Sequence, residues 1–447
     1  MLLVAGCGSR RSPDEIRAAS VQWDGDSTAA GAPYESGANG SGHSTSPDGE
    51  LVLGDEVTDG NAGSSNESTP TGRGSTGDGQ PGNGNEIVVA TVGNYSGIPG
   101  VVYVEAPKVL QAWAQTVNQT GGINGHPVRM IVRDDGSDPA QHLAIVRELV
   151  EKEGVVALLS QYAPLTGDAS VDYLTKAGVP VVGGEPSMSW WKQSPVFFPQ
   201  TAAGDHQFRR QVYAVARLAK AAGQRNVGVI VCAEASGCAD ASNRWQSYAD
   251  EADLHIVYTA TTSVASPDYT SECLAARNRD VEIIMATLDG NSLRRLAASC
   301  ARQGYRPMIW TQGGSAATSM QDDPNLQNFK STVEVYPFFL RGVPGARAMH
   351  AALDARLGTP ESHNIVTNAW LATQIFELAA SRVDGRVTSA ALLAALNTIE
   401  GETFGELSPP LTYRGRADTS DQQECWYNIS IEKGAYVSSD NAKLNCV

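Results

Sequence analysis

Polar and aromatic residues that could contact a ligand follow short apolar segments at several points of the chain. Tyr95 follows the apolar run 87–92. Ser160 follows the run 155–159, and Glu185 stands a few residues after a third run of this kind. In an open α/β sheet, ligands bind beyond the carboxyl ends of the strands. We therefore expect the hydroxyl, carboxylate and aromatic side chains of these loops to line a binding cleft.

Motifs of catalysis and of metal binding are missing from the sequence. It contains no Gly-x-Ser-x-Gly elbow, no His-Glu-x-x-His pair and no Gly-x-x-x-x-Gly-Lys phosphate loop. The acidic run of Asp134, Asp135 and Asp138 lacks the alternating ligands and terminal glutamate of an EF-hand loop. No cysteine pair has the spacing of a zinc site. We expect no catalytic residue, metal ion or cofactor, and a secreted hydrolase is the least favoured alternative.

Charge and composition divide the chain into two parts. Its 447 residues carry 33 Lys and Arg against 49 Asp and Glu, a formal net charge of −16. Nucleic acid is not an expected partner, because phosphate binding needs a basic surface. Residues 8–85 are rich in Gly, Ser and Asp and lack a periodic apolar pattern. Such a segment cannot bury enough apolar surface to fold, so we expect a disordered tether there.

The segment 121–150 carries the pattern of one α/β crossover. An Asn-Gly turn precedes a strand at 128–132, and Asp138 and Pro139 supply the N-cap and first position of a helix. The string Gly-Gly-Ile-Asn-Gly, a strand, then Asp-Asp-Gly-Ser-Asp-Pro resembles the first crossover of the branched-chain amino acid type of periplasmic binding protein. Members of that family are the extracellular receptors of ABC importers. The resemblance covers the chain from Glu86 to the C-terminus.

Strands and helices alternate through the rest of this region, which predicts parallel sheets covered on both faces. Strands are expected at 87–92, 128–132, 155–159, 179–182, 226–231, 254–258, 281–286, 307–310 and 426–431. Helices are expected up to about 118, from 139, and at 166–176, 205–222, 239–251, 268–278, 291–303, 364–382 and 389–399. The resemblance implies an α/β fold of two doubly wound lobes joined by a hinge that the chain crosses three times, near Thr201, Pro337 and Thr412. The N-terminal lobe would comprise 86–201 with 338–411, and the C-terminal lobe 202–337 with 412–447.

The N-terminus carries a possible membrane signal. Residues 1–7 read Met-Leu-Leu-Val-Ala-Gly-Cys and resemble the lipobox of bacterial lipoproteins. This resemblance implies lipid attachment to Cys7, which would anchor the protein through its tether to the outer face of the cell membrane. No apolar run reaches the length of about 18 residues that a membrane-spanning helix needs.

Six cysteines remain after Cys7, and an even number in an exported protein favours disulfide bonds. Six cysteines allow fifteen connectivities. The most economical pairing closes a small loop, links two helices on either side of a strand, and closes a hairpin near the C-terminus. These pairs are Cys232 with Cys238, Cys273 with Cys300, and Cys425 with Cys446.

In the resembling family, hydroxyls and backbone N–H groups of the first lobe hold a ligand carboxylate near helix N-termini. Ser187 stands where one hydroxyl is expected. Pro164 stands near the position of the other, so Thr166 or Ser160 would supply that hydroxyl instead. The first-lobe residues expected at the site are Tyr95, Ser96, Ser160, Gln161, Tyr162, Ala163, Pro164, Thr166, Glu185, Pro186 and Ser187.

On the second lobe, the family closes an aromatic and an acidic residue over the ligand's ammonium group. This sequence departs from that pattern, because Ser236 replaces a common tyrosine and Gln312 stands close to the glutamate position. Asp289, Glu185 and Glu234 are the acids that remain to neutralise an amine. The second-lobe residues expected at the site are Glu234, Ser236, Leu288, Asp289 and Gln312. Trp190 and Trp191 either add an apolar wall or pack beside the hinge.

The resemblance therefore predicts an extracytoplasmic substrate-binding lipoprotein of an ABC importer. It would act as a monomer, capture a small amino-acid-like or amphipathic solute by hinge closure, and deliver it to a membrane permease. The same fold also serves receptors that signal to a membrane partner, which is the main alternative.

Overall fold

The computed structural model describes residues 86–357, 363–414, 424–438 and 440–447, which belong to one compact unit. The expected lipid attachment at Cys7 and the tether over 8–85 lie outside the described residues. Within the described part of the chain, no helix is both long and apolar enough to cross a membrane.

The first sheet has five parallel strands in the order β2-β1-β3-β4-β5. They are β1 (Ile87–Gly93), β2 (Val128–Asp134), β3 (Ala157–Gln161), β4 (Val181–Gly184) and β5 (Phe197–Phe198). The helices between them are α2 (Gly97–Tyr103), α3 (Glu105–Gln119), α4 (Pro139–Glu151), α5 (Asp168–Ala177) and α6 (Trp190–Gln193). Strands β1, β3 and β4 are buried at every position, as strands covered on both faces must be.

The second sheet has eight strands. Its main path is β12-β11-β10-β9-β8-β6-β7, and β13 pairs with β11. The strands are β6 (Asn226–Cys232), β7 (His255–Thr262), β8 (Ile283–Thr287), β9 (Met308–Gln312), β10 (Phe329–Val333), β11 (Cys425–Glu432), β12 (Ala435–Val437) and β13 (Asn445–Cys446). Strands β6 to β10 pair in parallel, whereas β11 pairs antiparallel with β10, β12 and β13. The sheet is therefore parallel except at one end.

Helices cover both faces of the second sheet. They are α7 (Asp205–Ala222), α8 (Ser236–Ala249), α9 (Thr270–Arg277) and α10 (Gly290–Arg302). Buried side chains of α7 and α8 form one apolar cluster with β6 and β8, whereas those of α9 and α10 belong to another. Three short 3₁₀ helices follow β9, at Gly313–Ser315, Thr318–Met320 and Pro324–Leu326.

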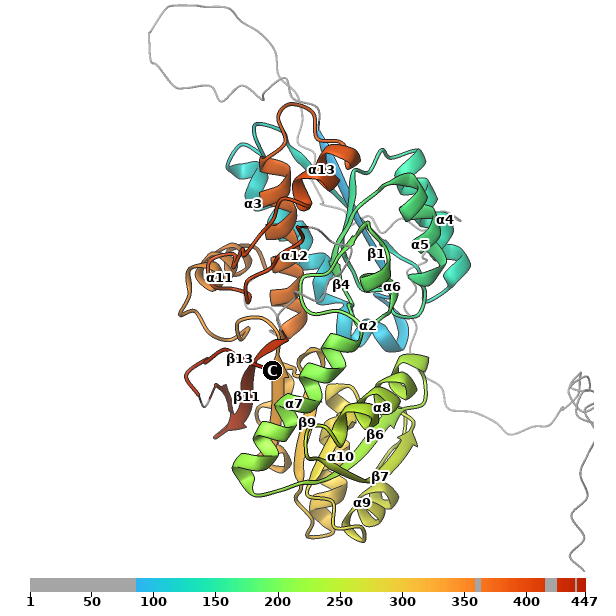
Figure 1. Cartoon of the computed structure of the whole chain (residues 1–447), viewed down its shortest axis with the longest axis vertical. Coiled ribbons are helices and arrows are strands. Elements are labelled where there is room, and N and C mark those ends of the chain that lie inside the picture. The colour runs from blue at the N-terminus through green and yellow to red at the C-terminus, as the bar shows by residue number, and fades with distance from the viewer. Residues whose placement is uncertain (1–85, 358–362, 415–423, 439) are drawn as a thin grey trace, which may run out of the picture. The chain divides into compact units, whose positions relative to one another are not determined.

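The chain passes from one sheet to the other three times, which confirms the expected fold class. After β10 it returns to the first sheet as α11 (Pro344–Leu357), α12 (Asn364–Ser381) and α13 (Ser389–Leu396), before β11 completes the second sheet. Helix α12 packs against α3, β3 and β4 and is buried at most of its positions. Figure 1 shows α3 and α12 on one side of β1 and α4 and α5 on the other. The exact limits of the two lobes stay predictions.

Local sequence features explain how these elements begin. Asp138 caps α4, because its side-chain oxygen accepts hydrogen bonds from the backbone N–H groups of Ala140 at 2.8 Å and Gln141 at 3.0 Å. Pro139 occupies the first helical position, where its missing N–H costs nothing. The loop between β2 and α4 is therefore held close to the carboxyl end of the sheet.

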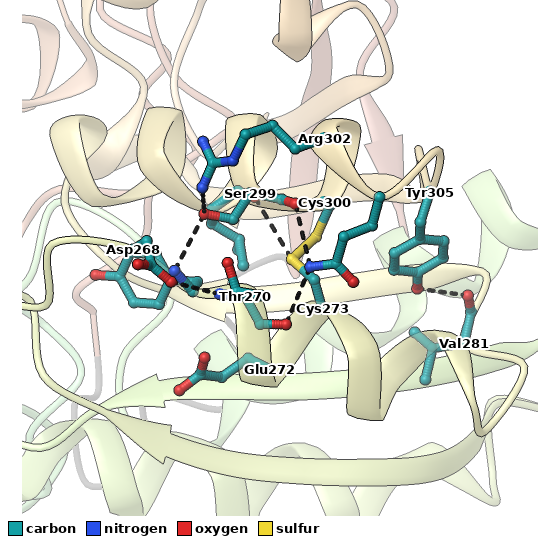
Figure 2. The surroundings of a disulfide bond; sticks show 12 residues. Asp268, Thr270, Glu272, Cys273, Val281, Ser299, Cys300, Arg302 and Tyr305 are labelled. Atoms are coloured by element: carbon teal, nitrogen blue, oxygen red, sulfur yellow. Dashed lines mark hydrogen bonds between the residues drawn. A yellow bond between two sulfur atoms is a disulfide. The ribbon is translucent and has the colours of Figure 1, made fainter.

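Three disulfide bonds join the expected cysteine pairs, Cys232–Cys238, Cys273–Cys300 and Cys425–Cys446. Figure 2 shows the second of them, which links α9 to α10. Beside it, Ser299 Oγ accepts hydrogen bonds from the backbone N–H of Tyr269 at 3.1 Å and from Arg302 at 3.0 Å. The bond and this hydroxyl together fix the two helices against each other.

Candidate functional site

A cavity of about 430 Å³ lies at the carboxyl ends of the strands of both sheets. This volume falls in the range of small-molecule sites, about 300–1,000 Å³. Apolar side chains line much of it: Val102, Leu165, Pro186, Val264, Leu288 and Ile365. The charged side chains of its wall are Glu185, Arg210, Glu234, Asp289 and Glu334.

Glu185 reaches the cavity from a tightly constrained strand end. Gly183 and Gly184 close β4 with φ values of 71° and 153°, which favour glycine. A Cβ atom on Gly184 would lie 2.2 Å from the carbonyl oxygen of Gln161, so no larger residue fits. The Gln200 side chain holds both backbone groups of Gly184, with its Oε1 at 3.0 Å from the N–H and its Nε2 at 2.9 Å from the carbonyl. The direction of Glu185 is thereby set by its backbone.

Two tyrosine rings form the wall beside Glu185. Tyr103, the last residue of α2, stacks on Tyr162 with ring centroids 4.9 Å apart and an angle of 16° between the planes. The Tyr103 hydroxyl donates a hydrogen bond to Glu185 at 3.4 Å. Burial raises the pKa of both phenols well above its usual value. The rings are therefore neutral, and their hydroxyls can donate.

Few groups stabilise the negative charge of Glu185 in its buried position. Besides Tyr103, it accepts a hydrogen bond from the backbone N–H of Ser187 at 3.3 Å, and the Ser187 side chain also stabilises its charged form. No described lysine, arginine or histidine forms an ion pair with it. Burial raises the pKa of Glu185, and the negative charge of Glu334 raises it further. This carboxylate would gain stability from a positive group in the cavity.

Arg210 and Glu334 form a largely buried ion pair in the same wall. Their side chains approach to 3.8 Å. Asn368 donates to Glu334 at 3.3 Å and accepts from Gln200 at 3.2 Å. Burial lowers the pKa of Arg210, and the charge of Glu334 opposes that shift. A chain of polar contacts thus runs from Gly184 on the first sheet to Arg210 on α7.

The acids on the second sheet's side already have partners. Glu234 accepts hydrogen bonds from the Ser263 hydroxyl at 2.6 Å and from the N–H of Val264 at 3.0 Å. Asp289 caps α10 and accepts from the N–H of Asn291 at 2.9 Å. These carboxylates are engaged in holding loops, unlike Glu185.

Further side chains shape the second wall. The disulfide Cys232–Cys238 links the end of β6 to α8, and both of its residues line the cavity. Gln312 accepts a hydrogen bond from Gln211 at 3.2 Å. The glutamate expected from the family at this place is therefore represented by a neutral, already bonded amide.

A separate polar network lies inside the first lobe, around Asp135. Its carboxylate accepts four hydrogen bonds, from Asn94 Nδ2 at 2.8 Å, the N–H of Ser137 at 2.9 Å, His142 Nδ1 at 2.8 Å and Thr166 Oγ1 at 2.6 Å. Burial pushes the pKa of Asp135 upward, but these hydrogen bonds outweigh burial, so it lies below its usual value. The network ties the loop after β2 to the loop that enters α5.

Part of this network has the order of a hydrolase triad. Ser170 Oγ lies 3.1 Å from His142 Nε2, and His142 Nδ1 lies 2.8 Å from Asp135. All three residues are 0% exposed, and the Ser170 hydroxyl donates to the carbonyl of Gly167 at 3.0 Å. A nucleophile must reach a substrate, and this serine has no route to one. The arrangement is explained as core packing of α4 against α5.

The structure brings part of the expected site together. The expected residues that line the cavity are Tyr162, Pro164, Glu185, Pro186, Glu234, Leu288, Asp289 and Gln312. Those that do not are Tyr95, Ser96, Ser160, Gln161, Ala163, Thr166 and Ser187. The side chain of Ser236 lies outside the described part of the structure. Direct ligand contacts of all these residues stay predictions.

Neighbouring side chains explain why some expected residues face away from the cavity. The Tyr95 hydroxyl lies 2.5 Å from Thr91 Oγ1, inside the first lobe. Thr166, considered as a substitute for the family's hydroxyl, donates instead to Asp135. Trp191 is buried and packs edge-on against Phe197 with centroids 5.1 Å apart, which supports its packing role.

Several wall residues were missed by sequence reasoning. They are Tyr103, Gln207, Arg210, Glu334 and Asn364. The α7 sequence carried a usable signal, because Gln207, Arg210 and Gln211 have the i, i+3, i+4 spacing of one helix face, and this face is buried. Charged and amide residues on a buried helix face need local partners. Within the described residues, no group of three His, Cys, Asp or Glu could hold a metal ion.

The two sheets and the cavity at their strand ends define a two-lobed ligand-binding protein. A family model described as periplasmic binding protein matches residues 86–435. The chain therefore belongs to the periplasmic binding protein family, and a general solute-binding role comes with that membership.

Individual proteins resemble the chain at low identity. A curated amino acid binding protein from Pseudomonas aeruginosa is 21% identical over 94 residues, which span 21% of this chain and 25% of that protein. A fatty acid ABC transporter substrate-binding protein from Thermomonospora curvata has a TM-score of 0.68 and 15% identity, covering 81% of this chain and 91% of that one. The branched-chain amino acid transporter substrate binding protein LivJ from Streptococcus pneumoniae, in complex with isoleucine, has a TM-score of 0.67 and 15% identity, covering 81% and 99%. At this identity, the structural likeness establishes the fold.

Proposed function

We propose that the protein is an extracytoplasmic substrate-binding lipoprotein of an ABC importer. It captures a small amino-acid-like or amphipathic solute by closing its two lobes, and it presents the solute to a permease without chemical change. Lipid on Cys7 keeps the monomer at the outer face of the membrane.

The cavity carries this proposal, because loops from both sheets contribute to its wall. A movement of one lobe against the other therefore changes its volume and its access to solvent. The apolar side chains of the wall suit the body of an amphipathic solute, and its charged groups suit a polar head. Structural neighbours named for fatty acids and for branched-chain amino acids support this solute class.

Two measurements on the purified full chain test the proposal. Thermal shift is measured against a panel of amino acids, amides, short peptides, aliphatic amines and aliphatic or aromatic acids, and small-angle scattering is recorded with each solute that responds. We expect at least one solute class to raise the unfolding midpoint, because binding stabilises the folded state. We expect the same solute to reduce the radius of gyration, because the lobes close.

A flat response in both measurements across the whole panel would contradict the proposal. Uptake of the bound solute by cells that carry a partner permease then separates import from signalling, since a sensor would bind the solute without accelerating its uptake.

A further inference from the structure

The charged side chains of the cavity wall differ in how well each is compensated. Arg210 pairs with Glu334 at 3.8 Å. Glu234 accepts from the Ser263 hydroxyl and the Val264 N–H of the loop after β7, and Asp289 accepts from N–H groups at the start of α10. Only Glu185, among the described charged residues of the wall, combines the lack of a cationic partner with hydrogen bonds as long as 3.3 and 3.4 Å. Three wall carboxylates thus lack a cationic partner among the described residues, and the one with the longest hydrogen bonds, Glu185, lies on the first lobe.

Two amide oxygens of the same wall also have no hydrogen-bond partner. Gln207 on α7 is 6% exposed, Asn364 at the start of α12 is 1% exposed, and their side-chain oxygens are both unpaired. Buried polar atoms are rarely left without a partner, because desolvation then costs about 1–3 kcal/mol. Both atoms are acceptors. Their natural complement is a solute that donates hydrogen bonds.

The aromatic wall adds a third contribution of the same sign. The stacked rings of Tyr103 and Tyr162 adjoin Glu185, whose carboxylate contacts the Tyr103 hydroxyl. The face of an aromatic ring attracts a cation through its quadrupole. A carboxylate beside aromatic rings is therefore suited to an ammonium group.

Resting on the proposed solute-binding role, we infer that the solute is an amphipathic molecule with a protonated primary or secondary amine. Glu185 binds the ammonium group beside Tyr162, the amide oxygens of Gln207 and Asn364 accept hydrogen bonds from solute donors, and the apolar wall holds the body. The ammonium then lies on the first lobe, whereas the family pattern places it on the second.

Calorimetric titration of the full chain with matched probes tests this inference. The probes are phenethylamine, its alcohol analogue 2-phenylethanol, phenylacetate, and the quaternary phenethyltrimethylammonium ion. We expect the amine to bind at least about thirtyfold more tightly than the alcohol or the carboxylate, because a buried charge pair is lost with either. The quaternary ion should bind about tenfold more weakly than the amine, since it keeps the charge but lacks N–H donors.

Variants locate the charge partner. Glu185→Gln should weaken amine binding at least about thirtyfold and leave alcohol binding unchanged. Glu148→Gln, on the exposed face of α4, is the matched control and should bind as the wild type does. Should Glu185→Gln fail to fold, the probe comparison on the wild type still decides.

The outcomes separate the inference from the proposed function. Tighter binding of phenylacetate than of phenethylamine, or unchanged amine binding by Glu185→Gln, overturns the inference while solute binding stands. If no probe here and no solute of the wider panel binds, both fail.

Discussion

Asp135 and Glu185 occupy equivalent places in the first sheet, yet their surroundings are opposite. Each is the first residue after a parallel strand, β2 or β4. Asp135 is fully buried and accepts four hydrogen bonds of 2.6–2.9 Å, which lower its pKa. Glu185 faces a cavity, accepts bonds of 3.3 and 3.4 Å, and has a raised pKa. The strand end positions a carboxylate, and the partners decide whether it serves structure or binding.

The largest expected effect comes from neutralising the structural carboxylate. Asp135→Asn should lower the free energy of unfolding by on the order of 3 kcal/mol, because His142 and Thr166 lose a charged acceptor in a buried network. Urea unfolding of the variant and the wild type measures the difference. Asp134→Asn is the matched control. The Asp134 carboxylate is exposed, so this substitution should lower the free energy of unfolding only slightly. Equal stability of the three proteins would remove the distinction between Asp135 and Glu185.

A smaller effect is expected at one donor of the same network. Thr166→Val removes the hydroxyl that donates to Asp135 but keeps the side-chain shape, so it should cost about 1–2 kcal/mol. Thr166→Ser keeps the donor and should recover most of the loss. Amine binding should change far less in Thr166→Val than in Glu185→Gln, because Thr166 does not line the cavity. If it changed as much, the hydroxyl would be part of the binding site after all.

The pH dependence of stability should have opposite signs at the two carboxylates. A lowered native pKa makes Asp135 stabilising above its unfolded value, and this contribution is lost as pH falls through the native pKa. A raised native pKa makes Glu185 lower the stability as pH rises from its unfolded value through the native one.

Glu185→Gln isolates the pH effect of Glu185 on stability. We expect this substitution to give the smallest change in stability of those considered. Its unfolding midpoint should match the wild type near about pH 3, where the glutamate is protonated in both states, and exceed it near about pH 8. Thermal unfolding across this interval, without solute, measures the difference. A variant less stable than the wild type near pH 8 would mean that the ionised carboxylate stabilises the empty site.

Much of the fold could be predicted from the sequence. The spacing of apolar residues within a short segment is enough to indicate a strand or a helix. The Asp138-Pro139 helix start and the three cysteine pairings agree with the structure. Strand β10 was missed because Lys330, Ser331 and Thr332 interrupt its apolar character. These residues nevertheless pair with both β9 and β11, so tertiary pairing, and not local propensity, makes the strand.

The site was predictable only at strand ends. Glu185 and Asp289 follow strands that the pattern revealed, and both line the cavity. Arg210 and Glu334 were missed because their meeting depends on two segments over a hundred residues apart, on either side of β6 to β10. The role of Thr166 also depends on residues distant in sequence, His142 and Asp135. Only the folded structure shows that its hydroxyl donates to Asp135.

The ionisation of Glu185 in the free and solute-bound protein tests the account most directly. Carbon NMR of protein labelled at the glutamate carboxyls gives its pKa, and the resonance missing from Glu185→Gln assigns it. We predict a pKa above the usual glutamate value in the free protein, because burial disfavours the charge, and a clear fall when phenethylamine saturates the cavity. The same pKa with and without the amine would contradict the assignment of Glu185 as the partner of the solute's charge.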